Sequence, residues 1–197
     1  IMPLGAFKAA LMGTAGVSTG AVVLLASTTA DDDATISFTS GIDSTYGEYI
    51  FKFYNLHPTV NQPNFSFQVN ATDGADYNDS LITSTYFRAS HTEADAVAFG
   101  YQTGADQAGG NAFQLLTQGN GDDPDMSCAG ELHLFNPAST VYVKNFYAEF
   151  NTSAGVSGTI HSIAAGYIDD ATAIDDIQFK FSSGSIATGI IKMWGVK

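Results

Sequence analysis

The sequence FSFQVN, residues 65–70, alternates large apolar side chains with polar ones. Phe65, Phe67 and Val69 fall on one face of an extended chain, because successive side chains of a β-strand point to opposite sides. The polar residues between them fall on the other face. This stretch therefore predicts a strand with one buried face.

The same period of two recurs on both sides of that stretch. Tyr49, Phe51 and Phe53 share one face of residues 49–54, and a third strand is predicted over residues 174–182. Further strands are expected over residues 21–26, 84–89, 112–117, 131–136, 140–150, 159–168 and 188–196. Turn-forming Gly, Asp, Asn and Pro separate these segments, and no long helix is apparent. The pattern predicts an all-β fold, a jelly-roll-like antiparallel β-sandwich.

The composition supports one large domain. The chain has 197 residues, of which 45% are hydrophobic, with 14 Phe and 9 Tyr to fill a core. We expect the sandwich over residues 21–197 and a short extended or helical arm over residues 1–20. Cys128 is the only cysteine, so an intrachain disulfide and a cysteine-rich zinc site are both excluded.

The charge is strongly acidic, with 20 acidic against 7 basic residues and a net charge of −13. Such a surface repels polyanions, and we expect no nucleic-acid partner. All but four of the acidic residues are Asp, which favours turns and also supplies calcium ligands. Two Asp-rich turns are candidate calcium sites, DGADYND with Asp73, Asp76 and Asp79, and GDDPD with Asp122, Asp123 and Asp125. Solvated turns are the alternative interpretation, and no other cofactor is expected.

No catalytic signature is present, and we expect no enzymatic activity. The four histidines lack metal-binding spacing, and no nucleophile-elbow, Walker or dinucleotide motif occurs. His133 lies between Leu132 and Leu134 on a predicted strand, so its side chain should point to solvent or to a partner. A pair of carboxylates for glycoside hydrolysis is not evident.

The N-terminal segment is apolar and rich in small residues, with Lys8 as its only basic residue. A secretion signal, a membrane helix and a docking arm are the alternatives. The Gly, Ser and Thr residues disfavour membrane insertion, and we favour an arm that buries its apolar side chains against partner subunits. We predict a helix over residues 6–12, and a polar turn at TTADDD, residues 28–33. The predicted docking residues are Ile1, Met2, Pro3, Leu4, Phe7, Leu11 and Met12.

Four stretches carry a family resemblance. They are ATISFTSGIDSTYGEYIFKFYNLHP (residues 34–58), FSFQVNATDGADYN (65–78), GELHLFNP (130–137) and AIDDIQFKFSSGSIATGIIKMWGV (173–196). In this order they resemble β-sandwich proteins encoded by tailed bacteriophages and described as virion structural or tail-fibre-like. The opening PLGAFKAALMGTAG, residues 3–16, is similar to the N-terminus of phage appendage proteins. The resemblance implies a jelly roll, a homotrimer and a place in the virion, and it transfers no catalytic residue.

We therefore expect a structural component of a phage particle, either a tail fibre or tail-tip appendage or a capsid decoration (cement) protein. Its partners would be other virion proteins and itself, without membrane insertion. The alternative is a carbohydrate-binding module for host surface glycans, with Tyr77, Tyr86, Tyr101 and Trp194 as candidate stacking residues.

Overall fold

The computed structural model describes residues 22–72, 74, 76, 77 and 79–197. These residues form strands and connecting loops only, and the fold is all-β and antiparallel. The strands are β1 (Val22–Asp33), β2 (Ile36–Phe38), β3 (Glu48–Pro58), β4 (Phe65–Ala71), β5 (Leu81–Thr92), β6 (Val97–Tyr101), β7 (Ala108–Gly110), β8 (Gln114–Leu115), β9 (Cys128–Phe135), β10 (Lys144–Ala154), β11 (Gly158–Asp169), β12 (Ile174–Phe181) and β13 (Ile186–Val196).

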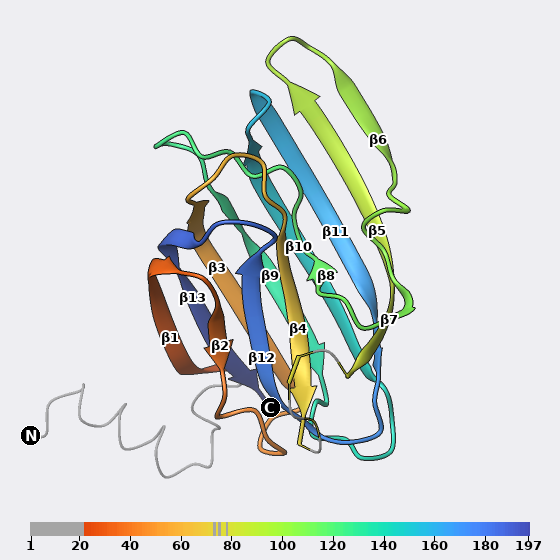
Figure 1. Cartoon of the computed structure of the whole chain (residues 1–197). Coiled ribbons are helices and arrows are strands. Elements are labelled where there is room, and N and C mark those ends of the chain that lie inside the picture. Colours follow the sequence, from red (N-terminus) through yellow and green to blue (C-terminus); the bar gives the residue numbers. More distant parts are fainter. Residues whose placement is uncertain (1–21, 73, 75, 78) are drawn as a thin grey trace, which may run out of the picture.

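Two sheets of unequal size pack face to face (Figure 1). The smaller sheet has the order β2-β12-β4-β8, and the larger sheet begins with β1-β13-β3-β9. These eight strands have the strand order of a jelly roll. The predicted fold class is confirmed.

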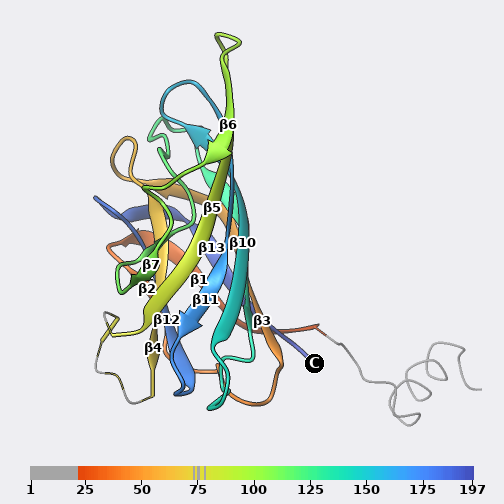
Figure 2. The ribbon, with the colours of Figure 1, turned by 90° about the vertical axis from the view of Figure 1, so that its right-hand side faces the viewer.

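Two insertions widen the larger sheet. One carries β5 to β7, between β4 and β8, and the other carries β10 and β11, between β9 and β12. Beyond β9 the sheet continues as β10-β11-β5-β6, while β7 pairs with β5. The hairpin of β5 and β6 extends past the rest of the molecule (Figure 2). We call β10, β11, β5 and β6 the inserted strands.

The jelly-roll core is built mainly of phenylalanine. The ring of Phe179 on β12 lies 5.0 Å from that of Phe53 on β3, and Phe53 lies 4.9 Å from Phe150 on β10. All three rings are buried. The period of two in the sequence arises because these strands each turn one face toward the opposite sheet.

Several sequence-based boundaries were wrong. The first strand continues through TTADDD to Asp33, where a polar turn was predicted, and Asp32 has a positive φ of 59° in it. As an edge strand, β1 pairs on one side only, so its solvent-facing positions accept charge. The strand predicted over residues 112–117 is reduced to β8, and the one predicted over 140–150 starts at Lys144. The predicted arm, including its helix, lies outside the described residues.

Candidate functional site

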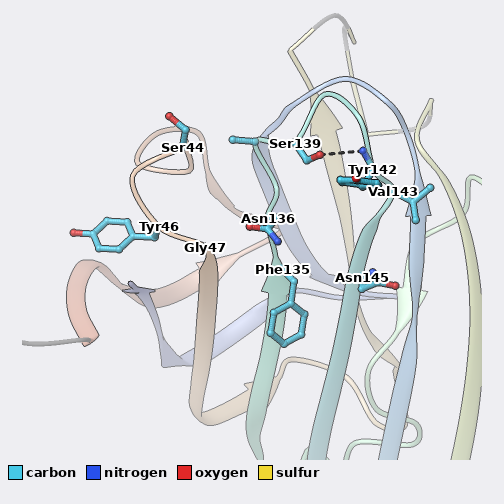
Figure 3. A pocket seen from close by; sticks show the side chains of 10 residues that line it. Ser44, Tyr46, Gly47, Phe135, Asn136, Ser139, Tyr142, Val143 and Asn145 are labelled. Atoms are coloured by element: carbon cyan, nitrogen blue, oxygen red, sulfur yellow. Dashed lines mark hydrogen bonds between the residues drawn. The ribbon is translucent and has the colours of Figure 1, made fainter.

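A pocket of about 630 Å³ opens at the rim where β9 ends and β3 and β10 begin (Figure 3). We call it the rim pocket. Its lining residues are Ser44, Tyr46, Gly47, Phe135, Asn136, Ala138, Ser139, Tyr142, Val143 and Asn145. This set combines three aromatic rings with two amides and two serine hydroxyls, and it contains no Asp, Glu, Lys, Arg or His. The volume is in the range of small-molecule sites.

Hydrogen bonds hold the loops of the rim pocket in place. In the β2–β3 loop, the Tyr49 hydroxyl donates to the Asp43 carbonyl oxygen at 2.9 Å and accepts from the Asp43 amide at 2.8 Å. In the β9–β10 loop, the Ser139 hydroxyl oxygen accepts from the Tyr142 amide at 3.0 Å. The two loops are joined by the Asn136 amide, which donates to the Gly47 carbonyl at 2.8 Å. The aromatic lining is thus presented by fixed backbone.

The surroundings of Asp43 and Tyr49 shift the pKa values of both side chains. Hydrogen bonds from the Thr45 hydroxyl and amide lower the pKa of the Asp43 carboxyl. Burial raises the pKa of Tyr49, which keeps its phenol protonated and able to donate. The residues that line the rim pocket thus carry no charge at neutral pH, while the ionised Asp43 lies outside the lining. Such a lining suits an aromatic, amide or hydroxyl-bearing ligand surface.

The described chain starts beside this pocket. Val22, the first residue of β1, pairs with Val196 of β13. The Gly47 amide in turn donates to the Val196 carbonyl at 3.1 Å. The point where residues 1–21 join the sandwich is therefore two strands from the pocket wall. The turn between β5 and β6 is at the opposite end of the molecule (Figure 1).

A second cluster lies on the outer face of the larger sheet, the face turned away from the smaller sheet. His133 Nδ1 lies 2.5 Å from Glu48 Oε1, and its Nε2 lies 3.3 Å from Glu131 Oε1. The imidazole stacks on Tyr147 at 4.3 Å between ring centroids. His133 thus points outward as predicted, but Tyr147 and its neighbours cover it, and only 8% of the residue is exposed. Of its two predicted surroundings, open solvent was wrong and a partner stays a prediction.

Lys52 completes this cluster, with its Nζ 3.2 Å from Glu131 Oε2. Burial alone raises the pKa of Glu131, but the hydrogen bonds and positive charge of Lys52 and His133 outweigh burial and lower it. These contacts tie β3, β9 and β10 together across the sheet. With the imidazole covered, the cluster has a structural role in joining strands.

The outer face of the inserted strands carries a group of exposed apolar side chains among polar ones. Val97 and Phe99 on β6 are 75% and 81% exposed. Phe87 on β5 packs edge-on against Tyr101 at 5.2 Å and pairs across the sheet with Ile163 of β11. Leu81, Tyr147 and Tyr167 extend the same face. We call these eight residues the apolar face. Large apolar patches of this kind mark contact surfaces.

The predicted calcium ligands fall in two loops. Asp76 and Asp79 lie between β4 and β5, while Asp73 lies outside the described residues. Asp122, Asp123 and Asp125 lie between β8 and β9, where the Asp123 carbonyl accepts from the Met126 amide at 2.8 Å. Within the described part of the chain, no three His, Cys, Asp or Glu side chains are placed to share a metal ion. The calcium site stays a prediction. All seven predicted docking residues, Ile1 to Met12, lie outside the described residues.

The four predicted stacking aromatics differ in exposure. Tyr86 is fully buried, so its selection as a surface ring was wrong. Tyr77 and Trp194 are half-buried. Tyr101 is exposed and donates from its hydroxyl to Asp106 Oδ2 at 2.6 Å. The rings that line the rim pocket, Tyr46, Phe135 and Tyr142, were not among the candidates.

One sequence signal pointed to the missed pocket. The Asn136-Pro137 pair marks a turn, and Asn136 has a positive φ of 45°. Counting Tyr142 as part of a long strand hid the loop that carries it.

Comparison with known proteins gives no family. No protein-family model matches the chain, and no curated protein sequence is significantly similar to it. In the described part of the chain, no helix has the length and apolar character needed to cross a bilayer.

Proposed function

We propose that this chain is a non-enzymatic structural component of a phage particle, a tail appendage or capsid decoration protein attached through its N-terminal segment. The observation that carries the proposal is the difference between the two ends of the molecule. Residues 1–21 join the sandwich at Val22, beside the rim pocket, and the hairpin of β5 and β6 projects from the other end. One end thus serves attachment and the other projects.

The sequence of the segment suits this role. It is largely apolar, with Lys8 as its only charged side chain, so burial against another subunit removes apolar surface from water at little electrostatic cost. The resemblance of four sequence stretches to phage virion proteins supports the same conclusion.

Particle incorporation tests the proposal. A variant lacking residues 1–21 is produced alongside the whole chain during assembly of the phage that encodes it, and purified particles are probed for each protein. We expect the whole chain in the particles and the truncated chain in the soluble fraction, with an unchanged β-sheet circular dichroism spectrum. A matched control replaces residues 1–21 with a Gly/Ser linker of equal length. Absence of the whole chain from particles, or full incorporation of the truncated one, contradicts the proposal.

Glycan recognition is the second candidate, and the rim pocket favours it. Aromatic rings beside amide and hydroxyl groups are the side chains that bind neutral sugars, through stacking and hydrogen bonds. Tyr142 is 75% exposed at the pocket mouth. A glycan array with host polysaccharides tests this function, and Tyr142→Ala should abolish any signal. Binding to no glycan, or equal binding by Tyr142→Ala, counts against the pocket as a sugar site.

A further inference from the structure

We propose that the apolar face of the inserted strands is a self-association surface, covered by a second copy of this chain. The inference goes beyond the proposed function, because it concerns the purified chain alone.

The first argument is the continuity of the apolar face across the sheet. Tyr101, Phe87 and Ile163 follow one another in register over β6, β5 and β11. In the next row toward the hairpin turn, Phe99 pairs with Ala89. Side chains on neighbouring strands of one face lie about 5 Å apart, so these residues form one surface.

The low charge of this face allows a second copy of the same chain as the partner. On the outer faces of these four fully described strands, the carboxylates are Glu149 and Asp169, against 20 acidic residues in the whole chain. Glu149 Oε1 also lies 2.9 Å from His161 Nε2. Two copies with a net charge of −13 repel each other through most of their surface, and least through this face. A strongly charged partner of either sign would find few counter-charges here.

The size of the face is sufficient. Strands β5, β10 and β11 have 12, 11 and 12 residues, and β6 has five. At ~4.8 Å between strands and ~3.3 Å per residue, they project roughly 600 Å². A stable interface of standard size buries about 800 Å² on each partner. Two such faces together bury about 1,200 Å², which is the lower end of the range for specific interfaces.

The smaller sheet leaves this face without an intramolecular cover. It packs on the opposite side of the larger sheet (Figure 2), where the ring of Phe67 on β4 lies 5.1 Å from that of Phe146 on β10. The buried side of β5 is closed by residues 102–117, with Ala105 and Leu115 against Tyr86. The outward side therefore presents aromatic and branched side chains that the fold itself does not use.

Light scattering during size-exclusion chromatography tests the inference on the whole chain. We expect the wild type to have a molar mass above the 20.7 kDa of one chain. Ile163→Lys and Phe99→Lys should each weaken association at least ~30-fold, as expected for charge placed at the centre of an interface. Val141→Lys is the matched control, because Val141 is 74% exposed on the rim loop at the other end. It should leave the mass unchanged.

Cross-linking provides a second readout that does not require a destabilising charge. Ile163→Cys should give covalent dimers with a short bismaleimide, whereas Val141→Cys should not. Cys128 is buried and should not react with the reagent. A wild type that remains one chain at high concentration overturns the inference, as does dissociation by Val141→Lys but not by Ile163→Lys. Self-association without particle incorporation would contradict the proposed function only.

Discussion

The jelly-roll strands and the inserted strands belong to one sheet but are stabilised differently. Behind β13, β3 and β9, the core is a continuous packing of phenylalanine rings from both sheets. Behind β5 and β11, the second buried cluster is small, with Tyr86, Ala105 and Ala164. Hydrogen bonds between buried polar groups supply much of the remaining stabilisation of this region. The difference teaches that the main core, which includes Phe146 and Phe150 of β10, carries most of the stability, whereas β5, β6 and β11 contribute mainly surface.

A hydrogen-bond network around two buried glutamines closes the insertion. Gln114 Nε2 donates to the carbonyls of Ala105 and Leu115, both at 3.0 Å, while its Oε1 accepts from the Ser84 hydroxyl at 2.6 Å. Gln68 Nε2 lies 3.1 Å from the Asn111 carbonyl oxygen. Amides thus satisfy loop carbonyls that would otherwise be buried without partners. These hydrogen bonds order the loop over residues 102–117 although it buries few apolar side chains.

The largest expected effect lies in the phenylalanine core. Phe179→Ala should lower the free energy of unfolding by about 3–5 kcal/mol, because it removes a ring that contacts both sheets and leaves a cavity. The matched variant Phe99→Ala changes an exposed ring on β6 and should stay within about 0.5 kcal/mol. Urea unfolding at low protein concentration measures both. Equal losses of unfolding free energy in the two variants would contradict the difference between the core and the exposed strand.

Alkaline pH should destabilise the region of the inserted strands around Tyr86. Burial raises the pKa of Tyr86 to about 12. Because the folded protein holds this proton more tightly than the unfolded chain, the stabilisation is complete below pH 10 and is lost as the pH rises toward 12. The loss amounts to roughly 2–3 kcal/mol. Unfolding measured from pH 9 to 12 should show a weaker pH dependence in Tyr86→Phe, and an identical dependence would contradict the assignment.

The glutamine network should have an intermediate effect. Gln114→Ala leaves two buried carbonyls and the Ser84 hydroxyl without this partner, which should cost about 1–3 kcal/mol. Hydrogen exchange should accelerate mainly in residues 102–117. The control is Gln178→Ala, since Gln178 forms its hydrogen bond with Ser37 on the exposed side of the smaller sheet. Faster exchange throughout the jelly roll would show that the two regions are not separable.

The smallest expected effect is the lack of a reaction at Cys128. Burial raises the pKa of its thiol to about 12, so little thiolate exists at pH 8 and the sulfur is inaccessible. A thiol reagent should label the unfolded protein rapidly and the folded protein only as fast as it opens. Prompt labelling of the folded protein would mean that the core near β9 opens readily.

How far the sequence predicts this molecule differs between the two regions. Alternating phenylalanines identified β3, β4 and β12, because those strands each bury one face against the other sheet. Strand β6 was missed although Val97, Phe99 and Tyr101 alternate with small residues, because the strand is only five residues long and both of its faces are largely solvent-facing. The inserted strands also turn large apolar side chains toward solvent. An alternating apolar pattern there does not identify the buried face.

The candidate sites were less predictable than the fold. Tyr86 was selected as a surface ring, yet it is buried, while Tyr142 was placed in a strand, yet it lies in an exposed loop. Which face of a strand is covered depends on the partner sheet. The sequence pattern around Tyr86 gives the alternation but not the side that the smaller sheet and the loops enclose.

Hydrogen exchange on the associated and dissociated protein tests the central claim, that the jelly roll holds the fold while the inserted strands make the contact. The wild type is compared with Ile163→Lys under identical conditions. We predict that dissociation removes protection from amides of β5, β6 and β11 and leaves β3, β4 and β12 exchanging only through global unfolding. Loss of protection at the rim pocket or in the smaller sheet, with the inserted strands unchanged, would contradict the account.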